Sequence, residues 1–116
     1  MPKRKQPLQR VSRIKRMNPA RKHRRFERAY HSESFCALVR WKGCVVRGCY
    51  TVPVQACHRV SRGAGGTWRD IFGACWLHHH ESHHTGLHAF AVKYGLDLEA
   101  ECASNVEEWL IMSKDG

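Results

Sequence analysis

The stretch 75-CWLHHHESHH-84 has histidine at five of its ten positions and begins with a cysteine. Histidine is the commonest metal ligand in proteins, so this density predicts a bound ion. The stretch can be interpreted in two registers. In the first, His80, Glu81 and His84 match His-Glu-x-x-His, in which two histidines one helical turn apart bind zinc and the glutamate is the base of a metalloprotease. This short pattern arises easily in a histidine-rich run, and no protease scaffold surrounds it.

The second register begins with Cys75 and His78, which are separated by two residues as in one half of a zinc site. Upstream, Cys44 and Cys49 form another pair around a turn. Four such ligands make a closed tetrahedral site for structural Zn²⁺. A zinc ion of this kind contributes about 10 to 16 kcal/mol of apparent binding free energy, enough to hold a small domain folded. The alternative is that Cys44 and Cys49 are simply small buried residues.

This register leaves His79 and His83 unassigned. They are four residues apart, so both project from one face of a helix and can hold a second cation. His58 lies between the two halves of the zinc site, in a strand-to-loop position. The order of a cysteine pair, a strand histidine, Cys-x-x-His and His-x-x-x-His is a more specific sequence signal than any one of these motifs alone.

With these residues the chain resembles the HNH endonucleases, the ββα-metal family, and in particular small phage or prophage members that carry a Cys/His zinc site. The segments that carry the resemblance are 44-CVVRGC-49, 56-ACHRVSRGAGGTWRDI-71, 75-CWLHHHESHH-84 and 90-FAVKYGLDLEA-100. It covers about residues 30 to 102. The resemblance implies an α+β fold, with a ββα-metal core, a zinc-stapled hairpin and flanking helices.

By resemblance, His58 is the first His and the general base, and Asp70 stands where the family commonly has its middle Asn. His79 and His83 would hold the catalytic divalent ion in the final helix, and cutting would leave 5′-phosphate and 3′-hydroxyl ends. Cys57 departs from the family, because many members have an acidic or second His ligand there. A thiolate is a poor Mg²⁺ ligand, so the ion would have few protein ligands, or be Mn²⁺, Ni²⁺ or Zn²⁺.

Arginines flank this predicted centre at Arg59, Arg62 and Arg69. The glycines of 61-SRGAGG-66 let the backbone approach a ligand closely, and arginine is suited to bidentate phosphate contact, so these residues could clamp DNA phosphates. The alternative is that they are surface charges on a solvated loop. A non-catalytic, zinc-stapled DNA-binding module therefore stands beside the nuclease as a second hypothesis.

The formal net charge of +10 is concentrated at the N-terminus. Residues 1–28 hold 12 of the 20 Lys and Arg with Glu27 as the single acid, whereas residues 29–116 hold eight bases and nine acids. We expect a basic flexible arm over residues 1–25 that attracts DNA, and a nuclease domain over residues 26–116 that is a monomer or a homodimer. The chain shows no signal peptide and no apolar run of membrane-spanning length, so we expect a cytoplasmic protein without a membrane partner, in the bacterial host if phage-encoded.

Hydrophobic spacing predicts the remaining elements. We expect one or two helical segments from Phe26 to near Lys42, short irregular strands within 44–60 and a loop over 61–66. A helix through the histidine stretch should end at Gly86, followed by helices over 87–95 and 96–112. The four tryptophans are expected to cap the zinc-linked core, at Trp41, Trp68, Trp76 and Trp109.

Overall fold

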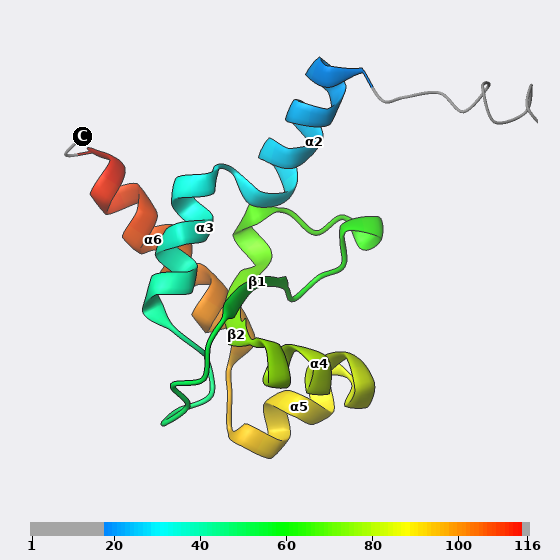
Figure 1. The fold of residues 1–116 in the computed structure, drawn as a ribbon, viewed down its shortest axis with the longest axis vertical. Helices are drawn as coiled ribbons and strands as arrows, with labels where there is room; N and C mark the ends of the chain where they lie inside the picture. Colours follow the sequence, from blue (N-terminus) through cyan, green and yellow to red (C-terminus); the bar gives the residue numbers. More distant parts are fainter. Residues whose placement is uncertain (1–17, 115–116) are drawn as a thin grey trace, which may run out of the picture.

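The centre of the molecule is an antiparallel pair of short strands, β1 (Val54–His58) and β2 (Ile71–Cys75), in which Val54 lies opposite Cys75 and His58 opposite Ile71. The computed structural model describes residues 18–114 of the 116-residue chain. The second strand runs directly into helix α4 (Trp76–Thr85). A strand pair followed at once by a helix is therefore the unit that carries the histidine stretch (Figure 1).

Within residues 18–114, four further α-helices surround this unit: α2 (Pro19–Tyr30), α3 (Glu33–Lys42), α5 (Leu87–Tyr94) and α6 (Leu98–Lys114). Helices α3 and α6 contact each other and the strands, whereas α5 packs on α4 at the other end of the molecule (Figure 1). The arrangement is α+β, as the sequence predicts. Among residues 18–114, no helix has the length and apolar character needed to cross a bilayer.

Local signals explain several helix ends. The hydroxyl of Ser32 accepts a hydrogen bond from the backbone N–H of Phe35 and so caps α3. That helix ends at Gly43, which has φ 91°, and α4 ends at Gly86, which has φ 92°. Both angles lie in the region that glycine adopts at little cost. The predicted helix ends at Lys42 and before Gly86 are confirmed.

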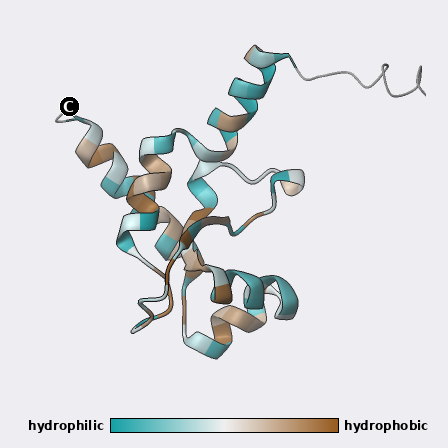
Figure 2. Ribbon diagram, viewed as in Figure 1, coloured by the Kyte–Doolittle hydropathy of each residue, from teal (hydrophilic) through white to brown (hydrophobic). Residues whose placement is uncertain are grey.

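Two buried clusters lie against the strands. Alternate strand residues separate them, because Cys57 and Phe72 belong to one cluster with α6, and Ile71 packs with Phe35 and Val39 of α3 in the other. Figure 2 shows hydrophobic colouring on the strands and on parts of α3, α5 and α6, while α2 and α4 are largely hydrophilic. The polar histidine helix is thus attached at the edge of the core and leaves its imidazoles accessible.

Helix α2 begins before Phe26, where the first helical segment was predicted, and so lies partly within the range predicted as the basic arm. The side chain of Asn18 accepts a hydrogen bond of 2.8 Å from the backbone N–H of Ala20, and Pro19 occupies the first helical turn. This is a strong helix start, because Asn is a favoured cap and Pro lacks the N–H that would be unpaired there. Residues 19–25 are therefore helical, and the rest of the predicted arm, residues 1–17, lies outside the described residues.

The strands also differ from the prediction. In the described chain, residues 44–53 form turns and irregular backbone, and the second strand is instead Ile71–Cys75. All five residues of that strand are buried, so it lacks the alternating pattern that identifies a half-buried strand.

The prediction that the four tryptophans cap the zinc-linked core is wrong. Trp41 and Trp76 are 84% and 50% exposed. Trp68 and Trp109 do pack inward, but around Phe35 in the cluster with Val39 and Ile71, away from the cysteine-rich cluster.

Candidate metal centres and a strand histidine

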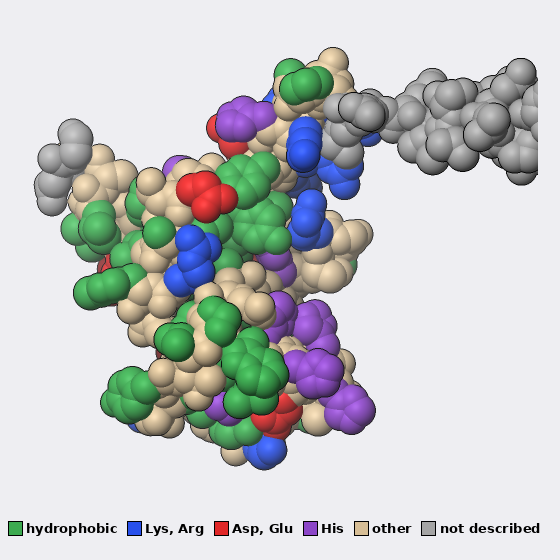
Figure 3. Space-filling model, viewed as in Figure 1, with side chains coloured by type: hydrophobic (Ala, Val, Ile, Leu, Met, Phe, Trp, Pro, Cys, Tyr) green, Lys and Arg blue, Asp and Glu red, His purple; other side chains and the backbone are tan. Residues whose placement is uncertain are grey.

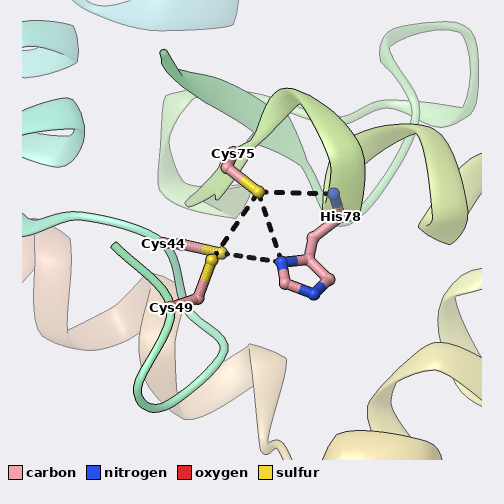
Figure 4. Close-up of side chains that lie close together, drawn as sticks. All are labelled: Cys44, Cys49, Cys75 and His78. Carbon is pink, nitrogen blue, oxygen red and sulfur yellow. Dashed lines mark hydrogen bonds between the residues drawn. The ribbon is translucent and has the colours of Figure 1, made fainter. Parts of the chain in front are cut away.

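Three cysteines and one histidine converge at the end of the strand pair. The ligand atoms of Cys44, Cys49, Cys75 and His78 all lie within 4.8 Å of one another (Figure 4). The Nδ1 atom of His78 is 3.4 Å from the sulfur of Cys44 and 3.3 Å from that of Cys75, and the sulfurs of Cys49 and Cys75 are 3.8 Å apart. Zinc bond lengths in a tetrahedron would place two sulfurs about 3.8 Å apart and sulfur and nitrogen about 3.6 Å apart. The four side chains predicted as a metal site are therefore close enough to hold an ion, consistent with structural zinc.

The loop that carries Cys44 and Cys49 is fastened to the second strand. The backbone N–H of Val45 donates to the carbonyl of Gly73 at 2.7 Å, and a Cβ at Gly73 would lie 2.8 Å from the carbonyl oxygen of Gly43. Only glycine allows this close approach of two backbones. The approach brings the thiols of the loop to Cys75 at the end of the strand.

Hydrogen bonds and burial set the protonation of these thiols. A backbone hydrogen bond from Thr51 lowers the pKa of Cys49 to about 6, whereas burial raises the pKa of Cys44 to about 11. The sulfur of Cys75 caps α4 by accepting from the backbone N–H of His78 at 3.5 Å. Such N–H donors stabilise negative charge on metal-bound sulfur. The donor set thus fits a thiophilic cation.

Two further imidazoles, those of His79 and His83, lie on α4. The Nε2 atoms of His79 and His83 are 3.0 Å apart, and Nδ1 of His79 contacts the side-chain oxygen of Gln55 on β1. Two cis ligands of one ion at about 2.0–2.1 Å would be about 2.9 to 3.3 Å apart. Burial, with a smaller effect from His83, lowers the pKa of His79, so its neutral, ligating form is favoured. The two imidazoles can bind one divalent ion and leave the remaining coordination positions of that ion open.

His58 is oriented by a backbone carbonyl. Its Nε2 atom lies 2.7 Å from the carbonyl oxygen of Ala29. That oxygen can only accept, so Nε2 carries the hydrogen and the lone pair is on Nδ1. The carbonyl belongs to the last turn of α2 and has no helical partner of its own. Tyr30 contacts the imidazole edge-on, with ring centroids 5.0 Å apart.

His58 lies on β1, and His79 and His83 lie on α4, which follows the second strand directly; the two groups do not contact each other. Within residues 18–114, no hydrogen bond or ring contact joins His58 to His79 or His83. Figure 3 shows histidine side chains in a band along one edge of the molecule, over α4 and toward the strands, below the Lys and Arg side chains of α2. Cys57 does not take part, because it is 3% exposed and burial raises its pKa to about 12.

Asp70 fastens the two ends of the loop between the strands. One carboxylate oxygen accepts from the backbone N–H of Thr67 at 3.0 Å, and the other pairs with the guanidinium of Arg59 at 3.2 Å. The backbone N–H of Arg59 also donates to the carbonyl of Asp70 at 2.7 Å. Asp70 is thus a positioning residue for the segment that follows His58, and its carboxylate is occupied by protein partners.

The other two predicted DNA contacts are surface residues that rest on aromatic rings. The guanidinium carbon of Arg69 lies 4.7 Å from the ring centre of Trp68, and that of Arg62 lies 5.7 Å from the ring centre of Tyr30. Both arginines are exposed. Stacking orders the guanidinium groups while their N–H edges stay accessible.

His80, Glu81 and His84, the residues of the protease register, do not form the arrangement that a metalloprotease needs. Both oxygens of Glu81 are occupied, one by Lys93 and the other by the hydroxyl of Tyr94, each at 2.7 Å. The hydrogen bond from Lys93 is the main reason that the pKa of Glu81 is lowered. The rings of His80 and His84 are stacked with centroids 6.5 Å apart. A carboxylate tied to α5 is poorly placed to activate water between those two imidazoles.

Sequence reasoning missed two partners of the histidines, Gln55 and the carbonyl of Ala29. Gln55 lies on β1, and its spacing in the sequence does not link it to His79 on α4. No sequence signal identifies a backbone carbonyl 29 residues away.

No family model, curated protein or solved structure matches this chain.

Proposed function

We propose that this protein is a metal-dependent endonuclease of the HNH type that hydrolyses phosphodiester bonds in DNA. The observation that carries the proposal is the orientation of His58 by Ala29, which leaves the Nδ1 lone pair available as a proton acceptor. A general base needs this free lone pair and a fixed ring. The chain order of a strand histidine, a loop, a second strand and a helix with His79 and His83 supports the same reading.

In this mechanism, Nδ1 of His58 removes a proton from the water that attacks phosphorus, and the Nε2–H bond to Ala29 stabilises the resulting imidazolium. A divalent ion held by His79 and His83 would supply Lewis-acid neutralisation of the phosphate and of the departing 3′ oxygen. With two imidazoles as protein ligands, Mg²⁺, Mn²⁺, Ni²⁺ and Zn²⁺ are all candidates. Asp70 keeps the loop after His58 in place, and Arg62 and Arg69 would contact flanking phosphates.

We further infer that the Cys44, Cys49, Cys75 and His78 cluster binds a structural zinc ion. Its role would be to hold the loop after α3 against the strands and α4. The resemblance to small phage nucleases suggests action in a bacterial cytoplasm on phage or host DNA.

The test is a plasmid-nicking assay with Mg²⁺, Mn²⁺ or Ni²⁺ on the zinc-loaded protein. We expect His58→Ala to lower the rate by about 10² to 10⁴-fold, the range for loss of a general base. His88→Ala is the matched control, because it removes an exposed imidazole from α5. Full metal-dependent nicking by His58→Ala would reject the mechanism. DNA binding without any nicking by the wild type would favour the non-catalytic binding module.

A further inference from the structure

A cleft of about 370 Å³ lies between α2 and the glycine-rich loop. It is lined by three arginines, one alanine and three glycines: Arg25, Arg28, Ala29, Arg62, Gly63, Gly65 and Gly66. No carboxylate lines it within the described part of the chain. The one acid of α2, Glu27, instead lies 3.4 Å from His23. The lining of the cleft therefore concentrates positive charge without an acidic side chain among its residues.

One wall of the cleft is backbone, and the sequence makes this possible. Gly66 is buried, and a Cβ there would lie 1.8 Å from the carbonyl oxygen of Val60. Gly65 has φ 95°, a conformation that favours glycine. With no side chains on this wall, a ligand can approach the loop closely, as phosphate groups do in glycine-rich loops.

The cleft is connected to the strand histidine through Ala29, which lines it, and through Tyr30, which contacts the lining residue Arg62. Ala29 lines the cleft, and its carbonyl accepts the hydrogen bond from His58. Tyr30 lies under the guanidinium of Arg62 and contacts His58 edge-on. A group bound in the cleft would thus lie next to the proposed base. In Figure 3, the Lys and Arg side chains of α2 lie on the same side of the molecule as the histidine band.

We propose that this cleft binds a phosphate of the DNA backbone beside the one that is cut. The proposal rests on the nuclease function argued above and adds a second contact point for the substrate. Arginines from two elements match the charge and the bidentate geometry of a phosphodiester. Because the contact is to the backbone, it would position any sequence equally well. It also makes α2 part of the substrate site, separate from the charge of residues 1–17.

The sharpest test uses Gly63, which lines the cleft, has no positive φ and has no atom within 4 Å of an added Cβ. Gly63→Asp places a carboxylate in the cleft, and Gly63→Asn places a neutral group of the same shape. Both are made on the His58→Ala background, and binding of a fluorescein-labelled duplex is followed by anisotropy without added divalent ion. We expect Gly63→Asp to weaken binding on the order of tenfold and Gly63→Asn to stay within about twofold. Equal affinities for the two variants would overturn the proposal.

Arginine substitutions give an independent measurement. Arg28→Gln with Arg62→Gln should lower the slope of log affinity against log salt by about 1 to 2, because each phosphate contact contributes about 0.9. Arg24→Gln with Arg47→Gln removes the same charge from exposed positions outside the cleft and should change the slope less. The same slope in both pairs would reject the cleft as a phosphate site.

The two proposals can fail separately. If wild-type protein nicks plasmid but the Gly63 variants bind DNA equally, the cleft assignment is wrong and the nuclease stands. If wild-type protein neither binds the duplex nor nicks plasmid, both are wrong. Unchanged zinc content and melting temperature in each variant keep a folding defect from imitating loss of the cleft.

Discussion

The Nε2 atom of His58 lies 2.7 Å from the backbone carbonyl oxygen of Ala29, which joins a strand residue to the last turn of α2. We expect the neutral imidazole to be the Nε2–H tautomer, because the carbonyl can only accept. Long-range ¹H–¹⁵N correlation spectra at a pH above the titration of this ring would show it directly. An Nδ1–H tautomer would contradict the proposed base, since no lone pair would then be available at Nδ1.

The same hydrogen bond marks where sequence reasoning stops. Ser32, Gly43 and Gly86 define helix boundaries through local hydrogen bonds and backbone angles, so a linear pattern predicts them. The close approach of Ala29 to His58 depends instead on how α2 packs against the strands. Nothing within a few residues of either position indicates it.

The predicted zinc half-site is confirmed in its spacing, but the strand that leads to it and the start of α2 were not predicted. Cys75 ends β2 and His78 lies in the first turn of α4, so their Cys-x-x-His spacing alone indicates a half-site. The strand that delivers Cys75 was missed, because a fully buried five-residue strand has no alternation. The start of α2 was missed because the arm was predicted from its charge, and the cap at Asn18 was not considered.

Loss of a zinc ligand should unfold the domain. Cys75→Ser removes one ligand of the cluster, and structural zinc contributes about 10 to 16 kcal/mol, comparable to or above the roughly 5 to 15 kcal/mol that typically holds a protein folded. We expect zinc loss by metal analysis and loss of the cooperative melting transition. Cys36→Ser is the matched control, because this buried thiol lies outside the cluster and already donates to the carbonyl of Tyr30. A folded, zinc-replete Cys75→Ser protein would reject the assignment.

Asp70 should contribute to stability through its two partners. Asp70→Ala removes the acceptor for the N–H of Thr67 and leaves the half-buried guanidinium of Arg59 without its carboxylate. We expect a loss of about 2 kcal/mol in the free energy of unfolding, measured with urea. Asp70→Asn keeps an oxygen acceptor for Thr67 and should lose about half as much. Equal losses for Ala and Asn would mean that the ion pair, and not the loop hydrogen bond, is the important interaction.

Glu81 should stabilise the packing of α4 against α5 through its hydrogen bonds with Lys93 and Tyr94. Hydrogen bonds from Lys93 and Tyr94 lower its pKa, so its contribution is present above the unfolded value of about 4.3 and lost as pH falls through the folded pKa. The stability difference between wild type and Glu81→Gln should therefore be present at neutral pH and shrink in acid. Glu107→Gln, at an exposed position on α6, should show no such trend.

The nicking assay adds a second readout for the same variant. Glu81→Gln should retain metal-dependent nicking, because both carboxylate oxygens are already bound by α5 residues. Peptide hydrolysis by the wild type that disappears in Glu81→Gln would revive the protease register.

Residues 2–17 should strengthen DNA binding through charge alone. This segment carries seven Lys and Arg and no acid, and it ends just before the Asn18 cap of α2, so its deletion leaves that helix start intact. We expect the deletion to weaken duplex binding and to flatten the salt dependence by about 0.9 for each phosphate that the segment neutralises. Nicking at saturating DNA should be preserved, since the histidines and the arginine cleft lie within residues 18–114.

A longer deletion, to residue 22, separates charge from helix structure. It would also remove Asn18 and Pro19, and should therefore lower the helicity of α2 in addition to weakening DNA binding. Circular dichroism measures the helicity, and anisotropy at several salt concentrations measures the binding of both deletion variants. An unchanged salt slope in the shorter deletion would exclude residues 2–17 from DNA binding, because phosphates that the segment neutralises must release counterions.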